Sequence, residues 1–419
     1  MAGKMNSLEE YGKKAKIASR ILAGIPVDRK NEVLNQAADH LIRYQGKILE
    51  ENSKDIKAAR NAGVKGALLD RLMLNEGRIA SMAEGLRQIA MLEDPVGEVL
   101  WMKQRPNGLL IGQQRVPLGV VGVIYEARPN VTADVAGLCL KTGNAAILRG
   151  GREAIFSNRA IVECLQDALK KTGLPEDSIQ LVTDTSRESA LALMRMNQYL
   201  DVLIPRGGAG LIKSVVENST VPVIETGTGN CHVFIDSPSD LMMGIDIIVN
   251  AKTHRPGVCN AAETLLVHKD MAEIFLPEAC RALSERNVEI RGDEKVCTLI
   301  PYAKKATEED WATEYLDLIL AVRVVESIDE AIDHIQKYST GHSEAIVTND
   351  YSHARRFLQE VDSAAVYVNA STRFTDGFEF GFGAEVGIST QKLHARGPMG
   401  LKELTTYKYI VFGNGQIRQ

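Results

Sequence analysis

Apolar residues recur with helical spacing along the first 92 residues of the chain, which predicts a helical N-terminal region. The sequence Ser-Leu-Glu-Glu at 7–10 has the form of a capping box, so we expect the first helix to open at Ser7. We expect further helices after Pro26, up to Gly63, and over residues 72–92. The helix after Pro26 should bury one face, made of Val33, Leu34, Ala37, Leu41 and Ile42.

At Gly97 the helical pattern stops, and two stretches of strand-forming residues, 98–105 and 109–116, flank the sequence Pro-Asn-Gly at 106–108. Asn-Gly is a strong signal for a tight hairpin turn. A long hairpin between a helical region and an α/β region is poorly placed to bury both faces in its own domain. We therefore interpret it as an arm that packs on another subunit, joined by a last strand at 407–412. A hairpin that caps its own domain fits the sequence equally well.

From 117 to 226, short apolar runs alternate with helical patterns. The expected strands are 119–125, 145–149, 179–182, 202–205 and 221–225. The expected helices between them are 132–141, 153–171, 187–196 and 209–217. Five buried strands separated by helices predict a parallel, doubly wound sheet, and such a sheet binds ligands at the carboxyl ends of its strands. The residues expected there are 126–130, 149–151, 206–208 and 226–229.

Two glycine pairs, at 150–151 and 207–208, follow strands of this expected sheet. The sequence Gly-x-Gly-x-x-Gly does not occur, so the usual dinucleotide fingerprint is absent. The two pairs can still bring backbone N–H groups and a helix N-terminus close to a phosphate. The alternative interpretation is that they only allow a tight turn from strand to helix.

From 241 to 401 the alternation resumes and predicts a second α/β domain. The expected strands are 264–268, 318–325, 345–348 and 365–368. The expected helices are 241–251, 272–284, 328–336 and 352–360. Residues 374–387 are rich in Gly and Phe, and we expect them to form an ordered surface loop at the edge of a cleft.

The most informative stretch, residues 252–264, lies between an apolar helix and a short buried strand of this second domain. Pro256 and Gly257 force a turn, and Cys259 follows with Arg255 and Asn260 close by. A nearby cation lowers the pKa of a thiol, and the backbone N–H groups of a turn can point at a substrate oxygen. Cys259 is therefore a candidate nucleophile. The alternative is a small cysteine that packs beside the turn.

The composition is that of an ordinary globular protein, with 45% apolar and 25% charged residues. A length of 419 residues favours two or three domains. The net charge of −5 gives no reason to expect nucleic acid or an anionic membrane as a partner. Six cysteines without a Cys-x-x-Cys pair argue against disulfides and zinc, so we expect no metal and a reducing, cytoplasmic location. We also expect no signal peptide and no membrane span.

Several of these stretches occur in an order that resembles the aldehyde dehydrogenase superfamily. They are residues 117–131, 141–151, 204–208, 223–232, 258–264, 339–345 and 366–370. Within the superfamily the gamma-glutamyl phosphate reductases are the most similar branch. The resemblance to that branch rests on Glu-Ala-Arg-Pro-Asn-Val-Thr at 126–132 and Arg-Pro-Gly-Val-Cys-Asn-Ala-Ala-Glu-Thr at 255–264. It covers nearly the whole chain.

The resemblance implies an α/β, aldehyde dehydrogenase-like fold in three parts. They are a Rossmann-like cofactor domain (1–96 and 117–227), an α/β catalytic domain (228–402) and a β-hairpin oligomerisation arm (97–116 and 403–419). It also implies a homo-oligomer, NADPH as cofactor and reduction of L-glutamyl 5-phosphate in proline biosynthesis. Transient contact with glutamate 5-kinase, which would protect a labile acyl phosphate, is a further hypothesis.

The same resemblance assigns roles to single residues. It implies that Cys259 is the nucleophile, Asn130 the oxyanion-hole amide and Glu225 the counterpart of the superfamily's general base. Arg149 replaces a cofactor-contacting lysine and is suited to a 2′-phosphate or a ribose. The expected cofactor-binding residues are Arg149, Gly150, Gly151, Arg206, Gly207, Gly208 and Gly227. The cations for the substrate's phosphate and carboxylate are expected among Arg128, Lys141, Arg255 and Arg373.

Chemistry limits the role of Glu225. Oxidative members use this glutamate to activate water against a thioester, whereas a reductase must pass a hydride to the thioester before water reaches it. In a reductase, Glu225 would then hold structure or help to set the ionisation of Cys259.

Three other classes stay open. A hydrolytic aldehyde dehydrogenase would keep Glu225 as its base. A cofactor-free cysteine acyltransferase or hydrolase would pair Cys259 with His254 or His232, although the position of His254 favours a helix C-terminal cap. A non-catalytic scaffold would leave Cys259 unreactive.

Overall fold

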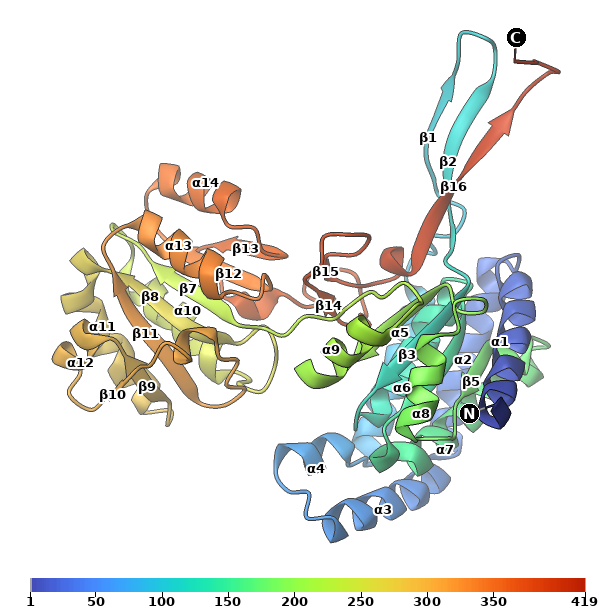
Figure 1. The fold of residues 1–419 in the computed structure, drawn as a ribbon, viewed down its shortest axis with the longest axis horizontal. Coiled ribbons are helices and arrows are strands. Elements are labelled where there is room, and N and C mark those ends of the chain that lie inside the picture. The colour runs from blue at the N-terminus through green and yellow to red at the C-terminus, as the bar shows by residue number, and fades with distance from the viewer. Residues whose placement is uncertain (1, 419) are drawn as a thin grey trace. The chain divides into compact units, whose positions relative to one another are not determined.

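A computed structural model describes residues 2–418, and the chain divides into two compact units. The first unit consists of Met1–Thr226, Gly381–Gly387 and Met399–Gln419. The second consists of Gly227–Phe380 and Ile388–Pro398. Figure 1 shows the elements of each unit with the labels used below.

The first unit opens with helices, as the sequence predicts. They are α1 (Ala2–Leu22), α2 (Val27–Arg43), α3 (Gln45–Asn61), α4 (Ala67–Leu72) and α5 (Glu76–Met91). The prediction that α1 opens at Ser7 is wrong, because Ala, Lys and Met before it are good helix formers and the helix already runs from Ala2. Helix α2 does begin after Pro26, and its predicted face is buried except for Ile42, which is 37% exposed.

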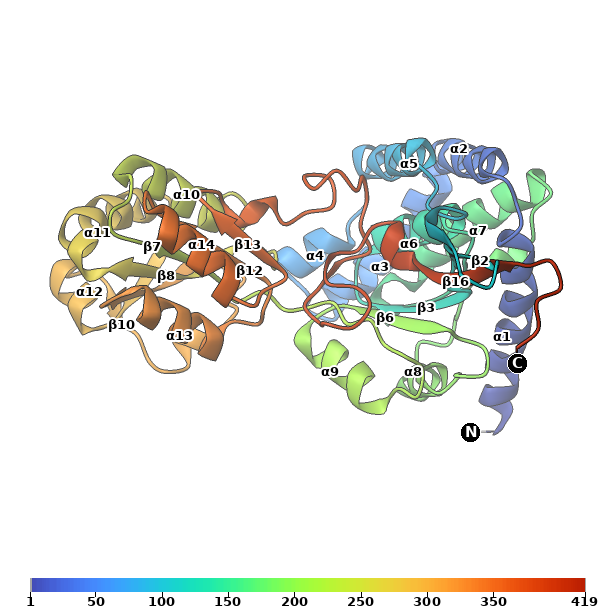
Figure 2. The ribbon, with the colours of Figure 1, turned by 90° about the horizontal axis from the view of Figure 1, so that it is seen from above.

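A four-stranded parallel sheet forms the centre of the first unit, in the order β5-β4-β3-β6. Its strands are β3 (Val120–Tyr125), β4 (Ala145–Gly150), β5 (Ile179–Leu181) and β6 (Val202–Arg206). The helices after them are α6 (Pro129–Lys141), α7 (Ile155–Lys171), α8 (Arg187–Met194) and α9 (Ala209–Asn218). Figure 2 shows α6 and α7 on one face of this sheet and α8 and α9 on the other. The prediction of a doubly wound sheet is therefore confirmed.

The fifth strand predicted for this sheet, over 221–225, is wrong. Only Val223 bridges to Leu203, as an isolated pair. Pro222 and, on the facing strand, Pro205 account for the difference, since a proline has no N–H to donate to a strand ladder on either side of this bridge.

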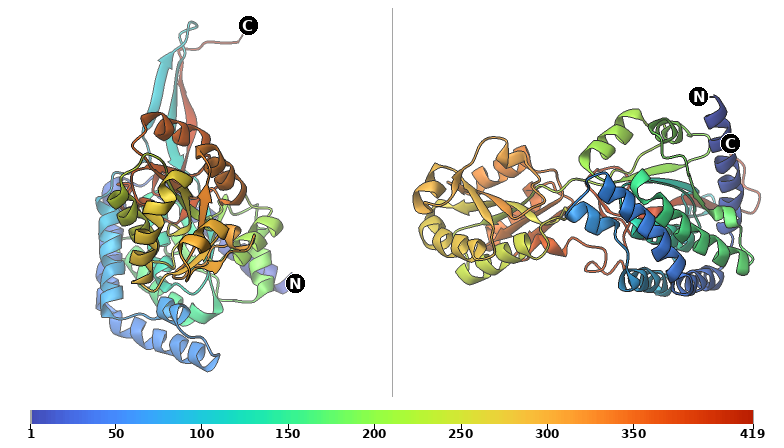
Figure 3. Two further views of the ribbon diagram at one scale, coloured as in Figure 1. Left: turned by 90° about the vertical axis from the view of Figure 1, so that its left-hand side faces the viewer. Right: turned by 90° about the horizontal axis from the view of Figure 1, so that it is seen from below.

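The hairpin and the last strand form a separate three-stranded antiparallel sheet of the first unit. Its order is β1-β2-β16, with β1 (Val99–Gln104), β2 (Leu110–Pro117) and β16 (Thr405–Phe412). In the turn, Gly108 has a φ of +86°, which glycine adopts without strain. Figures 1 and 3 show these strands extending beyond the helices of their own unit. The predicted hairpin and its pairing with the last strand are confirmed.

The second unit is built on a seven-stranded parallel sheet with the order β10-β9-β11-β8-β7-β12-β13. Its strands are β7 (Cys231–Ile235), β8 (Ala262–His268), β9 (Glu289–Gly292), β10 (Lys304–Lys305), β11 (Ile319–Val325), β12 (Ser343–Val347) and β13 (Ala365–Val368). Its helices are α10 (Leu241–Thr253), α11 (Lys269–Ser284), α12 (Glu294–Leu299), α13 (Ile328–Tyr338) and α14 (Tyr351–Glu360). The predicted second α/β fold is confirmed, although β7, β9 and β10 were not among the expected strands.

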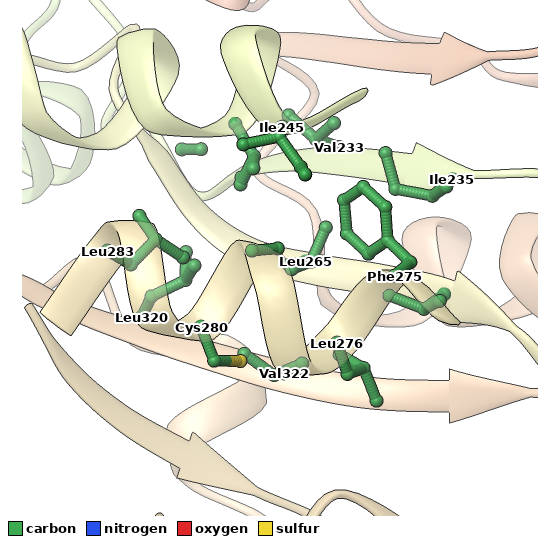
Figure 4. Close-up of a cluster of buried hydrophobic side chains, with 14 of the residues drawn as sticks. Val233, Ile235, Ile245, Leu265, Phe275, Leu276, Cys280, Leu283, Leu320 and Val322 are labelled. Carbon is green, nitrogen blue, oxygen red and sulfur yellow. The ribbon is translucent and has the colours of Figure 1, made fainter. Parts of the chain in front are cut away.

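Apolar side chains bury both faces of this sheet. Figure 4 shows the larger cluster, in which Phe275 and Leu276 of α11 pack on Leu265 of β8 and Val322 of β11. Helices α13 and α14 cover the other face with a second cluster that includes Phe357. Full burial of each such side chain stabilises a fold by about 1.5–3 kcal/mol. Two packed faces therefore fix the ends of β7 and β8, which carry the candidate nucleophile and its neighbours.

Residues 375–387 have little regular structure. They lie between a short 3-10 helix, η4 (Thr372–Phe374), which comes after β13, and a small hairpin of β14 (Ile388–Ser389) and β15 (Gly397–Pro398). The rings of Phe374, Phe378, Phe380 and Phe382 are all exposed. Among residues 2–418, none of the helices combines the length and the apolar character that crossing a membrane requires.

Candidate nucleophile loop and cofactor-type turns

Cys259 lies in an irregular turn at the amino end of β8. We call residues 254–261 the nucleophile loop; they connect α10, which ends at Thr253, to β8, which begins at Ala262. Within the loop the N–H of Ala261 donates to the carbonyl of Val258 at 3.1 Å. The Cys259 side chain is half-buried. The predicted turn is therefore confirmed, and the thiol of Cys259 is partly accessible.

The chain entering β7 packs directly against the backbone of Cys259. A Cβ atom on Gly229 would lie 1.5 Å from the Cys259 carbonyl oxygen, so only glycine fits there. The Gly229 N–H donates to Glu314 Oε1 at 2.7 Å. The Cys231 thiol donates to the same Cys259 carbonyl at 3.1 Å. Burial, and then the charges of Glu344 and Cys259, raise the pKa of Cys231, so it stays a thiol donor.

Two of the four expected substrate cations lie in the electrostatic environment of Cys259. Burial lowers the pKa of Arg373, the charge of Arg255 lowers it further, and Asp376 and Cys259 raise it. Arg255 is exposed and belongs to the nucleophile loop, whereas Arg373 is half-buried and comes from η4. The fold thus gathers Cys259, Arg255 and Arg373, and such cations favour the thiolate form of a cysteine.

At the carboxyl ends of the first unit's strands, a carboxylate occupies one of the expected phosphate turns. Strand order reverses between β3 and β6, which is where doubly wound sheets bind nucleotides. Glu126 follows β3, and its Oε2 accepts a hydrogen bond of 2.9 Å from the N–H of Gly208, the N-cap of α9. A Cβ on Gly207 would meet the same carboxyl group at 2.7 Å. The helix N-terminus therefore binds an anion that the chain itself supplies.

Arg149 lies at the end of β4 with its guanidinium partly engaged. Its Nη2 donates to the carbonyls of Thr185 and Ser186 at 2.6 and 3.1 Å. Its Nε is buried and has no hydrogen-bond partner among residues 2–418. Burial lowers the pKa of Arg149, partly offset by Glu153 and Asp184. One N–H of this cation is therefore left for a ligand at the strand's carboxyl end.

The remaining expected cofactor glycines pack closely on side chains. A Cβ on Gly150 would meet Asn158, and one on Gly151 would meet Glu153, both at 2.1 Å. A Cβ on Gly227 would meet Thr390 at 2.2 Å, and the Gly227 N–H donates to Ile388 at 2.9 Å. Close packing explains glycine at 150, where Asn158 is buried, whereas the Glu153 carboxyl group next to Gly151 ends a flexible side chain that can move aside. The role of these glycines in cofactor binding stays a prediction.

Asn130, the expected oxyanion amide, is exposed on the first turn of α6. Its Nδ2 donates to Asp134 Oδ2 at 3.0 Å, one turn along the helix. Burial raises the pKa of Asp134 to about 6, although the Asn130 hydrogen bond and the charge of Arg206 act in the opposite direction. Arg128 is the half-buried N-cap residue of α6, and Glu225 is half-buried after the isolated bridge at Val223.

The prediction that Lys141 binds the substrate is wrong. Lys141 is the last residue of α6 and precedes β4, so it lies at the amino edge of the sheet. Its side chain is fully buried, and Nζ donates to Asn31 Oδ1 and to the Ala90 carbonyl at 2.7 and 2.8 Å. Burial lowers its pKa, with Asp94 acting against it. Lys141 joins helices of the first unit instead.

The two histidines of the competing hydrolase hypothesis lie in different settings. His254 is the exposed C-cap residue of α10, and its N–H donates to Asn250, as expected for a helix end. His232 is fully buried in β7, with Nδ1 3.0 Å from Glu344 Oε2. In the part of the chain that the structure describes, no three His, Cys, Asp or Glu side chains gather as a possible metal site.

Three features of these sites were not predicted. Asn260 links the nucleophile loop to η4, Glu126 accepts from Gly208, and Lys252 forms a buried ion pair with Glu263. Asn260 and the ion pair all lie within the stretch 252–264, so their position beside Cys259 was a usable signal. Nothing local to Glu126 indicates its partner, which is 82 residues away.

The comparisons with known proteins agree with this geometry. The family model described as "Aldehyde dehydrogenase family" matches residues 2–317 and 305–410. Gamma-glutamyl phosphate reductase of Clostridium perfringens is 64% identical over 413 residues, which is 99% of this chain and all of that protein. Gamma-glutamyl phosphate reductase of Carboxydothermus hydrogenoformans is 64% identical over 414 residues, with the same coverage.

A solved structure agrees as well. The crystal structure of gamma-glutamyl phosphate reductase from Thermotoga maritima is similar with a TM-score of 0.96 and 52% identity, covering 98% of this chain and all of that one. The expected aldehyde dehydrogenase-like fold and the expected branch are both confirmed. The chain belongs to the aldehyde dehydrogenase family and, within it, to the gamma-glutamyl phosphate reductases.

Proposed function

We propose that the chain reduces L-glutamyl 5-phosphate to L-glutamate 5-semialdehyde and phosphate, with NADPH, as a step of proline biosynthesis. The observation that carries the proposal is a cysteine in a turn beside two arginines, in a chain that matches named gamma-glutamyl phosphate reductases over their full length. An acyl phosphate is a doubly anionic electrophile, and a thiol close to two cations suits it.

Cys259 is the proposed nucleophile. The thiolate attacks the acyl carbon, the carbon–oxygen bond to phosphate breaks, and phosphate leaves with the electron pair of that bond. The product is a thioester on Cys259. Arg255 and Arg373 support this step because they stabilise the thiolate before attack and the phosphate as it leaves. Arg128 stays a weaker candidate for the substrate's carboxylate.

An oxyanion forms at the acyl oxygen during attack, and again when the thioester is reduced. The backbone N–H of Cys259 and the amide of Asn130 are its proposed donors. Asp134 already accepts one N–H of the Asn130 amide, which leaves the second N–H for an oxyanion. Loss of one such donor typically lowers kcat by about 100- to 1,000-fold.

The first unit has groups that suit a nicotinamide dinucleotide. The Gly207–Gly208 turn opens α9, and the Gly208 N–H donates to the Glu126 carboxylate, which supports this turn as the place where a phosphate binds. The buried and unpartnered Nε of Arg149 offers a donor at the next strand. We assign the dinucleotide phosphates to Arg206, Gly207 and Gly208, and the ribose or 2′-phosphate to Arg149. NADPH bound there would supply the hydride that reduces the thioester.

Glu225 is proposed not to act as a general base in the reaction. Water activated by a carboxylate would hydrolyse the thioester and waste the substrate, so a reductase gains from keeping this group away from the acyl carbon. A role in structure or in the ionisation of Cys259 is consistent with its half-buried side chain.

The three-stranded sheet of β1, β2 and β16 is the proposed oligomerisation arm. It exposes Val99, Leu100, Trp101 and Met102 on one strand and Tyr407, Tyr409, Val411 and Phe412 on another. So many exposed apolar side chains indicate an interface. Replacing Trp101 by Lys should shift the chain toward monomer in size-exclusion chromatography with light scattering. Transient association with glutamate 5-kinase is a separate hypothesis, and absence of binding at cellular concentrations would remove it.

The test of the proposed reaction is to run it backwards. Glutamate 5-semialdehyde, phosphate and NADP⁺ are mixed with the enzyme, and NADPH is followed by its absorbance. We expect phosphate-dependent NADPH formation that is lost in Cys259→Ala. Lys213→Ala, which changes an exposed residue of α9, is a control that should keep full activity.

Other outcomes identify the competing classes. Turnover that needs no phosphate would indicate a hydrolytic aldehyde dehydrogenase with Glu225 as base. Absence of turnover with either nicotinamide cofactor, together with a reactive Cys259, would indicate a cofactor-free acyltransferase or hydrolase. An unreactive Cys259 would indicate a scaffold.

A further inference from the structure

Asn260, the residue after Cys259, is the centre of a hydrogen-bond cluster that ties the nucleophile loop to η4. Its Nδ2 donates to the carbonyls of Arg373 and Thr375 at 3.3 and 2.9 Å. Its own carbonyl accepts from Thr372 Oγ1 at 2.7 Å. The side chain is only 4% exposed. Both ends of η4 are therefore fixed to Asn260, the first through its backbone carbonyl and the second through its buried side-chain amide.

The same amide holds the side chain of Arg373. Asn260 Oδ1 accepts a hydrogen bond from Arg373 Nη1. The guanidinium is half-buried, and its Nε finds no partner in the described part of the chain. A buried N–H without an acceptor costs free energy. An anionic ligand that accepts from this edge of the guanidinium would remove that cost.

Hydrogen bonds among three hydroxyl groups further restrain the cluster around Asn260. Thr375 Oγ1 lies 2.6 Å from Ser343 Oγ at the start of β12 and 2.7 Å from the hydroxyl of Tyr367 in β13. Thr375 itself is fully buried. Arg373 is thus attached through Asn260 to the nucleophile loop and through Thr375 to two strands of the sheet. A guanidinium held in this way loses little conformational entropy when it binds an anion.

We propose that Asn260 is a positioning residue that holds the Arg373 guanidinium beside Cys259, and that Arg373 binds the phosphate end of the substrate. This inference rests on the proposed function, because it takes Cys259 as the nucleophile. The phosphate is bonded to the carbon that Cys259 attacks, whereas the α-carboxylate is several bonds away. A cation fixed next to the sulfur therefore meets the phosphate. The planar fork of a guanidinium matches phosphate oxygens better than a lysine does.

Arg255 has a different role in this arrangement. It is exposed in the nucleophile loop, whereas Arg373 is half-buried and held by a buried amide. An exposed, hydrated arginine attracts anions but does not orient them. We therefore assign orientation of the phosphate to Arg373 and general attraction to Arg255.

The test compares two alkylating reagents that differ in charge. Iodoacetate is an anion and iodoacetamide is neutral, and both modify the same thiolate. The ratio of their rate constants at Cys259, located by peptide mass spectrometry, therefore reports nearby positive charge and cancels the ionisation of the thiol. We expect wild type to prefer iodoacetate and Arg373→Gln to lower the ratio by roughly 10-fold. Asn260→Ala keeps the charge of Arg373 but removes the hydrogen bond that holds its guanidinium, so we expect the ratio to fall less, by about 3-fold.

Further variants separate positioning from structure. Arg286→Gln removes an exposed arginine just after the end of α11 and should leave the ratio unchanged. Arg373→Lys should restore most of the charge effect on alkylation. In the reverse reaction, Arg373→Gln should raise the KM for phosphate by about 10-fold or more and leave the KM for the semialdehyde unchanged. A purely structural Asn260 would instead slow both reagents equally and lower the melting temperature.

Each failure points to a different error. If no alkylation occurs at Cys259 in any variant, the proposed function itself is wrong. If Cys259 reacts but Arg255→Gln lowers the ratio and Arg373→Gln does not, the assignment of Arg373 is overturned. If Asn260→Ala fails to fold, an unchanged ratio and phosphate KM in Arg373→Gln would still refute the inference.

Discussion

Lys252 and Glu263 form an ion pair that closes the base of the nucleophile loop. Lys252 Nζ lies 2.5 Å from Glu263 Oε2, and both side chains are fully buried. The other carboxylate oxygen accepts from the N–H of Leu316 at 3.2 Å. Burial lowers the pKa of Lys252 and raises that of Glu263, and each charge opposes the shift of the other. Because the two residues border the loop on either side, the pair fixes both of its ends.

Breaking this pair from one side should destabilise the second unit strongly. Glu263→Gln or Lys252→Met leaves a buried charge without its partner, so we expect the free energy of unfolding to fall by about 3–5 kcal/mol. The double variant Lys252→Met/Glu263→Leu should lose less, because no buried charge remains. Urea unfolding measures the difference. The exposed pair of Lys305 and Glu294, 3.2 Å apart, is the control, and Lys305→Ala should cost at most about 1 kcal/mol. Equal losses at the two sites would show that the buried pair does not fix the loop.

Gly229 should be essential for the reactivity of Cys259. A methyl group at this position would occupy space 1.5 Å from the Cys259 carbonyl oxygen, so Gly229→Ala has to displace the nucleophile loop. We expect iodoacetamide labelling of Cys259 and reductase activity to fall by at least about 100-fold. Gly210→Ala in α9 is the control, since nothing lies within 4 Å of its Cβ and alanine favours a helix. Normal labelling in Gly229→Ala would mean that the loop adapts without moving the thiol.

The elements of the fold were largely predictable because their apolar patterns are local. A few consecutive positions are enough to predict the structure in residues 33–41 of α2 and in the buried strands β3, β4, β8 and β11. Errors arose where one or a few residues override the pattern around them. Pro222 breaks the expected fifth strand, and good helix formers before Ser7 extend α1 past an apparent capping box.

The site was predictable only in part, because its contacts join residues distant in sequence. Cys259 stood out through its own neighbours, but Asn260 and Arg373 are 113 residues apart, and no local pattern predicts their hydrogen bond. Lys141 shows the opposite error. It was expected among the cations that bind the substrate's phosphate and carboxylate, whereas tertiary packing buries it against Asn31 and Ala90.

Glu126 should compete with the cofactor for the N-terminus of α9. If a dinucleotide phosphate binds the Gly208 N–H, the carboxylate that now accepts it must leave, and its charge opposes the approach of phosphate. Glu126→Gln should therefore tighten NADPH binding by about 3- to 10-fold in isothermal titration calorimetry, while the melting temperature falls slightly through loss of a charged cap. Glu217→Gln, an exposed change near the end of the same helix, should leave NADPH binding unaltered. Weaker NADPH binding in Glu126→Gln would show that Glu126 contacts the cofactor itself.

Acid should destabilise the second unit through His334. Burial lowers the pKa of His334 to about 2, helped by the charges of His232, Arg323 and Lys337. Its ring is 3% exposed, lies among aromatic rings, and accepts from Arg323 through Nδ1 at 3.1 Å. The folded state thus keeps His334 neutral, while an unfolded histidine takes up a proton below pH 6.5. Stability from this group is complete above pH 6.5 and is lost as pH falls, by about 1.4 kcal/mol per pH unit.

Replacing His334 by a residue that does not titrate should weaken the pH dependence of the free energy of unfolding. The free energy of unfolding, measured with urea at pH 7 and pH 5, should fall by about 2 kcal/mol less in His334→Leu than in wild type. The variant should be less stable at pH 7, because Arg323 loses its acceptor on His334. The loss should be small, since Arg323 keeps its 2.8 Å hydrogen bond to Glu330. His394→Leu, at an exposed position, should keep the wild-type dependence. An unchanged slope in His334→Leu would mean that the ring is already protonated while the unit is folded.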